Sequence, residues 1–266
     1  MEEKSGHNHL KRTITTIAFS QEKVSEKTRN IYSKVIEHSK CINEENFTKI
    51  SAEDLEFLFD QYDTAFFSGL LRKLLESEKG GTLNFTLSKR MTKAGGKTKF
   101  FKKQTKIGNK LHEEPIYEIS IAITLLFHTF SDINRNITIN GIVCNDRLEA
   151  LQRIFEHEVI HLVELLVWRK SSCSAPHFKT LVKSIFAHTE TTHQLVTQQE
   201  RAIVKYGINI GDKVEFQYKN AKYIGIVNRI TKRATVLVEH EDGRLYSDKK
   251  RYVKFYIPLS MLKKVS

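Results

Sequence analysis

The stretch His157-Glu158-Val159-Ile160-His161 decides how this chain is interpreted. If these residues are helical, the two histidines lie one turn apart and present their imidazole rings on the same face. Two neutral imidazoles at that separation can bind one Zn²⁺, and Glu158 between them can act as general base toward a zinc-bound water. A hydrogen-bonded pair of core histidines is the competing interpretation.

Apolar residues at helical spacing surround this motif and predict a buried helix from about Asp146 to Trp168. They are Leu148, Leu151, Ile154, Phe155, Val159, Ile160, Leu162, Val163, Leu165 and Leu166. Burying two histidines and a glutamate side by side is costly unless these side chains have a function such as binding a metal. The surroundings therefore favour a metal site over a pair of core histidines.

Other segments predict an α+β fold around this helix. A polar helix is expected over 21–40, and Ser51 to Asp54 is typical of a capping box that begins a helix with an aromatic stripe. Alternating patterns predict strands at 83–87 and 117–121, a possible strand at 97–103 follows the Gly95-Gly96 turn, and a short buried piece is expected at 125–127. A further helix should run over 175–187, with Pro176 inside its first turn.

The pattern changes after Gly207, where five short strand-like runs are separated by turn residues. The runs are 214–216, 223–227, 234–238, 244–246 and 253–257. Such spacing predicts a small closed β-barrel. The expected organisation is an N-terminal tail and polar helix (1–48), a metal-binding domain (49–200) and the small barrel (205–266).

Positive charge is unevenly distributed along the chain. Residues 201–266 hold 15 Lys/Arg against 6 Asp/Glu, whereas residues 1–200 hold 28 against 25. A second concentration lies between Lys79 and Lys110, with ten basic residues and no acidic one. Such asymmetry is typical of proteins that bind a polyanion, most often nucleic acid, although a merely soluble basic surface is the simpler explanation.

Composition also predicts the compartment. The polar residues 1–9 lack the apolar core of a signal peptide, and no segment approaches the ~18 apolar residues of a membrane span. Cys41, Cys144 and Cys173 are an odd, widely spaced set that does not suggest disulfides. We expect a cytoplasmic protein in a reducing compartment with no membrane partner, and nucleoid association would be compatible with its charge.

Several pieces together resemble one family. The segment 58–70, the stretch Leu87-Ser88-Lys89-Arg90-Met91-Thr92-Lys93-Ala94-Gly95, the strand 117–121 and the helix 151–161 are similar, in order and spacing, to SprT-like domains. The resemblance covers roughly residues 50–190. It implies a zincin-like metalloprotease of the SprT and Spartan type, which in that family is tied to DNA-associated proteolysis and the repair of DNA–protein crosslinks.

One departure leaves the third zinc ligand open. The family takes this ligand from a His-Gly-x-x-Phe pattern after the motif helix, but Ser174 stands at that position here. A catalytic zinc needs three protein ligands and an open position for water. We predict His177 as the third ligand beside His157 and His161. The alternatives are His188, His193, Cys173 and Glu164, and Glu164 is also a candidate for orienting a ligand.

The sequence thus predicts a zinc-dependent endopeptidase with one catalytic Zn²⁺, Glu158 as base, and protein substrates associated with nucleic acid. DNA is expected ahead of RNA. Candidate nucleic-acid contacts are Arg90, Lys93, Lys97, Arg229, Lys232 and Arg233. The alternative is a nucleic-acid-binding adaptor whose zincin domain is degenerate or structural, because the family histidine is absent.

Overall fold

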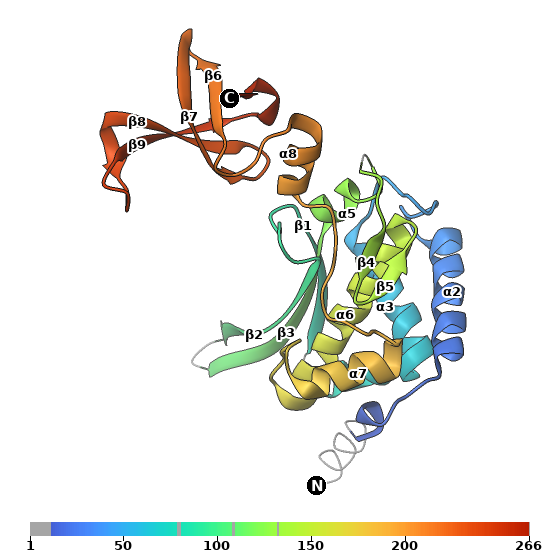
Figure 1. Ribbon diagram of the computed structural model, residues 1–266. Helices are drawn as coiled ribbons and strands as arrows, with labels where there is room; N and C mark the ends of the chain where they lie inside the picture. The colour runs from blue at the N-terminus through green and yellow to red at the C-terminus, as the bar shows by residue number, and fades with distance from the viewer. Residues whose placement is uncertain (1–11, 79–80, 108–109, 132, 266) are drawn as a thin grey trace. The chain divides into compact units, whose positions relative to one another are not determined.

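The computed structural model describes residues 12–78, 81–107, 110–131 and 133–265, so residues 1–11 of the expected tail lie outside it. The chain forms two compact units, one ending at Leu195 and the other beginning at Val196 (Figure 1). None of the described helices is both long enough and apolar enough to span a bilayer.

The first unit combines helices with a small mixed sheet. Its helices are α2 (Gln21–His38), α3 (Ala52–Phe67), α4 (Leu70–Ser77), α5 (Ile123–His128), α6 (Arg147–Trp168) and α7 (Pro176–Phe186). Its strands are β1 (Thr82–Ser88), β2 (Gly96–Ile107), β3 (Lys110–Ala122), β4 (Ile137–Ile139) and β5 (Ile142–Cys144). The mixed α+β character expected from the sequence is confirmed.

The three-stranded sheet has the order β1-β3-β2, in which β1 runs parallel and β2 antiparallel to β3. Helices α3, α4 and α6 contact this sheet. Strand β2 is at the sheet edge and also contacts α6, so the edge strand lies directly beside the helix that carries the histidine motif. Residues 125–127, expected as a short buried piece, belong to α5.

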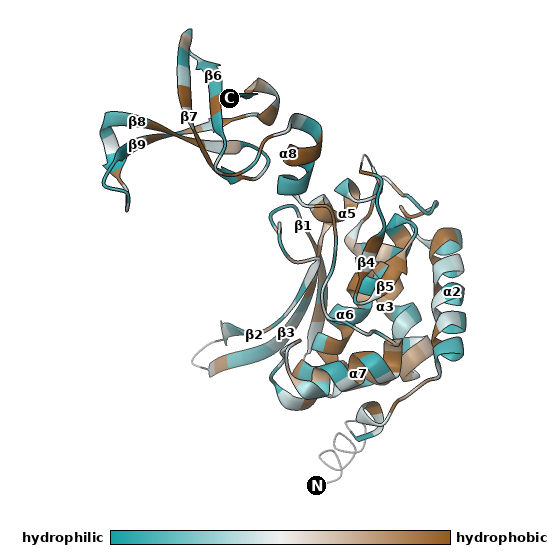
Figure 2. Ribbon diagram, in the orientation of Figure 1, coloured by the Kyte–Doolittle hydropathy of each residue, from teal (hydrophilic) through white to brown (hydrophobic). Residues whose placement is uncertain are grey.

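Helix α6 is the central element of the first unit. Asp146 caps its start by accepting a hydrogen bond from the backbone N–H of Glu149 at 2.8 Å, as expected for an N-cap carboxylate. Most of its 22 residues are buried, and hydrophobic residues are concentrated on α3 and α6, whereas α2 is mostly hydrophilic (Figure 2). Helix α2 still buries Val24, Ile31 and Val35 and packs on α3 and α6.

The second unit contains α8 (Gln198–Tyr206), the 3₁₀ turn Leu259–Met261 and a five-stranded antiparallel sheet. Its strands are β6 (Lys213–Tyr218), β7 (Ala221–Ile230), β8 (Ala234–Leu245), β9 (Arg251–Ile257) and β10 (Lys263–Lys264). Their order is β10-β6-β7-β8-β9. Within the part of the chain that the structure describes, β9 and β10 are not paired, so the expected closed barrel is not confirmed.

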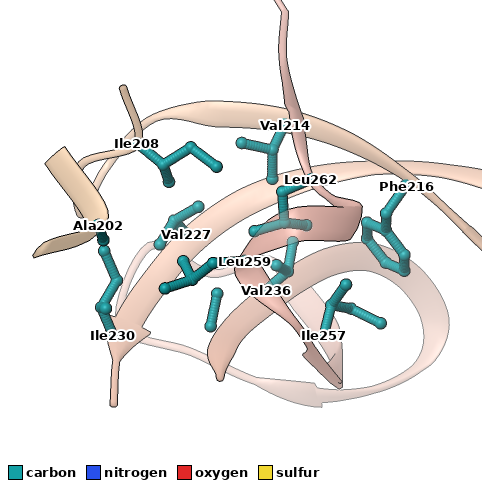
Figure 3. Packing of buried hydrophobic residues seen from close by; sticks show 11 residues of the cluster. Ala202, Ile208, Val214, Phe216, Val227, Ile230, Val236, Ile257, Leu259 and Leu262 are labelled. Carbon is teal, nitrogen blue, oxygen red and sulfur yellow. The ribbon is translucent and has the colours of Figure 1, made fainter. Parts of the chain in front are cut away.

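One hydrophobic cluster stabilises this second unit. It joins α8, the sheet and the 3₁₀ turn, and Figure 3 shows its side chains converging: Ala202, Ile208, Val214, Phe216, Val227, Ile230, Val236, Ile257, Leu259 and Leu262. Alternate residues of β6 and β8 supply much of it, as the period of two in those strands predicts. In β7 an irregularity after Val227 separates Val227 from Ile230 by three residues. The opposite face of the sheet is left for exposed side chains.

Candidate metal centre

Helix α6 places His157 and His161 on one face, as the motif predicts. Their Nε2 atoms lie 3.1 Å apart, and their rings meet edge to face at 4.8 Å between centroids. Phe178 of α7 packs against both rings, at 4.8 Å from His157 and 4.4 Å from His161. The two nitrogens are therefore directed at a common point and held there by an apolar ring.

Cys173 completes a group with these histidines. One ligand atom from each of His157, His161 and Cys173 lies within 4.8 Å of the other two, and we call these residues the metal cluster. Among the described residues it is the one group of three or more His, Cys, Asp or Glu side chains with this geometry. Two imidazole nitrogens and a thiolate are donors that Zn²⁺ prefers, and three protein ligands leave a fourth position open. The residues present therefore fit a catalytic zinc.

The protonation of His157 suits this role. Burial, and to a smaller extent the neighbouring rings of His161, His188 and His193, lowers the pKa of His157 to about 3. The ring is thus neutral at physiological pH, as a ligand must be. Its Nδ1 is buried without a hydrogen-bond partner within the described chain.

The second ring nitrogen of His161 is held by a chain of polar groups. Nδ1 lies 2.5 Å from the hydroxyl of Ser171, and that hydroxyl donates to Oε2 of Glu164, also at 2.5 Å. Burial raises the pKa of Glu164, but hydrogen bonds involving His161, Ser171 and Ser172 outweigh it, so the pKa is lowered and the carboxylate is ionised.

Glu158 lies beside the cluster and is fixed by β2. Thr98 donates from its hydroxyl to Oε2 of Glu158 at 2.7 Å, and the same hydroxyl is 3.0 Å from the backbone oxygen of Glu158. Gly96 gives the carboxylate its space, because a Cβ there would meet Cγ of Glu158 at 2.6 Å. Burial raises the pKa of Glu158, and the neighbouring ring of His161 and the hydrogen bonds from Thr98 only partly oppose this. A raised pKa suits a group that must both accept and release a proton.

The cluster and Glu158 line one cavity of about 680 Å³. Its walls come from α6, from residues 93–98, which span the start of β2, and from the segments around Cys173 and His193. This volume is in the range of ordinary ligand sites. The metal cluster and the predicted base thus share a cavity that is open to a substrate, whereas His177 does not line it.

The alternatives for the third ligand have other partners. His177, our prediction from sequence, lies outside the cluster, with Nε2 2.6 Å from Oε1 of Glu164 and its ring beside Trp168. His188 is fully buried and lies 2.7 Å from Glu156. His193 lines the cavity but is not part of the group of converging ligand atoms. Proximity in sequence suggested His177, whereas the path of the loop brings Cys173 to the histidines.

The predicted nucleic-acid contacts lie in different parts of the molecule. Lys93 and Lys97 are exposed and line the cavity, and Arg90 is exposed in the loop after β1. The other three, Arg229, Lys232 and Arg233, are exposed in the second unit. The basic run between Lys79 and Lys110 is partly neutralised by β3, through ion pairs of Lys99 with Glu118 and of Lys102 with Glu113.

Thr98, Gly96 and Ser171 were not among the residues predicted from sequence. Strand alternation places residues 96 and 98 on one face, but no local pattern indicates that this face meets Glu158. Ser171 follows α6 in a polar loop and carries no motif of its own.

Comparison with known proteins gives one match. A model of the SprT-like family matches residues 55–198, which is more than half of the chain and includes the motif helix and Cys173. No curated protein and no solved structure matches the chain.

Proposed function

Because the chain belongs to the SprT-like family, we propose that it is a zinc-dependent endopeptidase with His157, His161 and Cys173 as metal ligands and Glu158 as the general base. The family is associated with metallopeptidases and is generally zinc-dependent. The single observation that carries the proposal is the convergence of three ligand atoms beside a buried glutamate in one cavity.

When bound, Zn²⁺ supplies Lewis acidity and lowers the pKa of a bound water toward about 7. Glu158 accepts the proton from the attacking water and delivers it to the leaving amine. Thr98 holds the Glu158 carboxylate in one orientation through its 2.7 Å hydrogen bond, so little reorganisation is needed when the proton moves.

Strand β2 is suited to hold the substrate backbone. It is the edge of its sheet, and Gly96 and Thr98 lie directly beside Glu158. An extended peptide added to this edge is bound through main-chain hydrogen bonds, which are largely independent of sequence. We therefore expect a protease with low sequence preference that cleaves unfolded or locally extended segments.

The decisive experiment pairs zinc content with proteolysis of a denatured protein substrate. Wild type should bind one zinc per chain and cleave the substrate, and Glu158→Gln should keep the zinc but lose about 10²- to 10⁴-fold in activity, the range of general base catalysis. His157→Ala should lose the zinc. Cleavage by Glu158→Gln at the wild-type rate would exclude the proposed mechanism.

The alternative function is an adaptor with a degenerate zincin domain. Its main support is the serine at position 174, where the family carries a histidine ligand. The place of Cys173, one residue earlier and within reach of both histidines, supports the enzyme instead. Wild-type protein without bound zinc and without proteolysis would favour the adaptor.

We further propose that nucleic acid brings protein substrates to this enzyme. In the second unit, strand register places Arg229, Thr235 and Tyr256 in one row on the outer face of the sheet. The ring of Tyr256 is 61% exposed and available for stacking on a base, while Arg229 and the neighbouring Lys254 are exposed cations. This combination suits single-stranded nucleic acid better than a duplex.

Binding of a fluorescent single-stranded DNA and of its duplex to the full chain tests this partner. Affinity should fall steeply with salt. Tyr256→Ala should weaken the single strand by about 1–3 kcal/mol, the usual value of one stacked base, with a smaller effect on the duplex. Equal binding by Tyr256→Ala and wild type would remove this surface from consideration, without bearing on the peptidase.

A further inference from the structure

Glu164 is a buried carboxylate for which the proposed mechanism has no use. It lies three residues after His161 on α6, and its side chain is 0% exposed. A buried carboxylate is costly unless it is hydrogen-bonded. Its partners therefore indicate what it contributes to the site.

Among the described residues, the polar groups that contact Glu164, other than His161, come from the segment between α6 and α7 and from the first turn of α7. Ser171 donates its hydroxyl to Oε2 at 2.5 Å, and the backbone N–H of Ser172 donates to the same oxygen at 3.1 Å. Nε2 of His177 lies 2.6 Å from Oε1, a close contact that lacks the geometry of a hydrogen bond. These contacts lie on both sides of Cys173 in the sequence, so one carboxylate holds the loop that presents the thiol.

The same carboxylate acts on His161 through Ser171. Because the serine hydroxyl donates its proton to Glu164, its oxygen is left to accept the proton on Nδ1 of His161. This arrangement places the ring proton on Nδ1 and leaves the lone pair of Nε2 directed toward His157. Hydrogen bonds of this kind fix the tautomer and the orientation of metal-binding histidines.

We propose that Glu164 is the positioning residue that assembles the metal centre, holding His161 through Ser171 and the Cys173 loop through Ser171, Ser172 and His177. His177, which sequence proximity suggested as a ligand, is thereby a partner of this carboxylate. The inference rests on the proposed zinc centre and adds to it the reason why Cys173 reaches the two histidines.

The chain offers a matched control in Glu156. This residue is also on α6, is also 0% exposed and also contacts a histidine, His188, at 2.7 Å. Its other partners are Tyr62 and Arg153. Neither Glu156 nor any of its three partners belongs to the metal cluster. Glu156 directly precedes His157 in the chain, but its side-chain contacts do not include a proposed ligand. Glu156→Gln therefore changes the same chemical group at a comparable depth without removing a contact to the metal cluster.

The experiment measures zinc affinity of the purified full chain by competition with a chromophoric chelator. Glu164→Gln should weaken zinc binding by about 10- to 100-fold, the range seen when partners of metal ligands are removed. Glu156→Gln should leave zinc affinity unchanged even if it unfolds earlier. Wild-type affinity in Glu164→Gln would overturn the inference, as would an equal loss in both variants.

Cobalt substitution distinguishes the two proposed roles of Glu164, which are to orient His161 and to place Cys173. Co²⁺ bound to a thiolate gives a sulfur-to-metal charge-transfer absorption, which reports the bond to Cys173. Glu164→Gln should weaken this band, whereas Ser171→Ala should keep it and lower affinity by a smaller factor, because Ser172 and His177 still hold the loop. An unchanged band in Glu164→Gln would contradict a role in placing Cys173.

Failure of this inference is distinguishable from failure of the proposed function. Wild-type protein that binds no zinc would contradict the zinc centre itself. Wild-type protein that binds zinc, together with Glu164→Gln that binds it equally, would contradict only the role of Glu164. If Glu164→Gln does not fold, Ser171→Ala provides the test, because its lower zinc affinity is predicted from the contact with His161 alone.

Discussion

Two buried carboxylates on α6 each lie beside a histidine, yet they belong to different kinds of site. Glu156 contacts His188, Tyr62 and Arg153 in what we call the Glu156 cluster, and Glu164 contacts His177, Ser171 and Ser172. In the Glu156 cluster every member is buried, and the charge of Arg153 balances that of Glu156. Around Glu164, the partners extend along a loop to the metal cluster and an open cavity.

This difference shows what separates a structural histidine from a candidate ligand. Both His157 and His188 have a buried Nδ1 without a partner within the described residues, and burial lowers the pKa of both. Neither property is therefore diagnostic. The convergence of further ligand atoms at the edge of a cavity is the property that His157 has and His188 lacks.

The largest effect on stability should come from breaking the Glu156 cluster. Arg153→Met removes the cation 2.9 Å from Glu156 and leaves a buried carboxylate without its counter-charge. Such losses typically cost about 3–5 kcal/mol in the free energy of unfolding. Denaturation followed by fluorescence of Trp168, the only tryptophan, reports the first unit. A cost below about 1 kcal/mol, the range of exposed pairs, would mean that the pair is not buried in solution.

An intermediate effect, on catalysis alone, is expected at the metal site. Thr98→Val removes the hydroxyl that donates to Glu158 while nearly keeping the shape of the side chain. A hydrogen bond to a charged group is worth about 1.5–3 kcal/mol, so kcat/KM should fall by roughly 10- to 100-fold with zinc affinity unchanged. A parallel loss of zinc would instead assign Thr98 to the integrity of the cluster.

The pH dependence of stability offers a smaller test of the Glu156 cluster. Burial lowers the pKa of His188, although Glu156 opposes the shift. In the unfolded chain the ring has a pKa of about 6.5, so below that pH the unfolded state takes up a proton that the folded state does not. The stability that His188 contributes is therefore present above about pH 6.5 and is lost as the pH falls.

Urea denaturation of metal-free protein on both sides of that pH measures this loss. The free energy of unfolding should fall more steeply between neutral and mildly acidic pH in wild type than in His188→Asn, which has no ring to protonate. Equal slopes would show that His188 is not the group responsible.

The smallest effect on stability should come from His177, which contacts Glu164 as His188 contacts Glu156. Its side chain is 49% exposed, so its contact with Glu164 is screened by solvent. His177→Ala should lower the free energy of unfolding by less than about 1 kcal/mol. Circular dichroism is the appropriate measurement, because the ring of His177 contacts Trp168 and its removal alters fluorescence directly. A cost as large as that of Arg153→Met would mean that the His177–Glu164 contact is as important for stability as the Glu156 cluster.

Local patterns in the sequence predicted much of the first unit. The apolar spacing around His157 predicts α6 within a residue at each end, and the Ser51–Asp54 capping box begins α3 as expected. Strand alternation identified β1 and β3, and the segment after the Gly95-Gly96 turn identified β2, although β2 and β3 are longer than the predicted segments. In the second unit four of the predicted runs correspond to strands, but residues 244–245, expected in a separate strand, form the end of β8, and β10 was not expected. The open order of the sheet was not predicted either, because pairing between distant strands leaves no mark in a local window.

The sequence by itself determined that His157, Glu158 and His161 share one turn of a helix, because helical geometry repeats every 3.6 residues whatever surrounds it. Only the tertiary structure decided which side chain joins them. Cys173 and His177 are similarly close in the chain, and contacts of Glu164 with the loop, not sequence distance, direct the thiol to the histidines. The lysines of β2 show the same distinction. In the sequence they form a run without acidic residues, but the pairing of β2 with β3 brings Lys99 and Lys102 within ion-pair distance of Glu118 and Glu113.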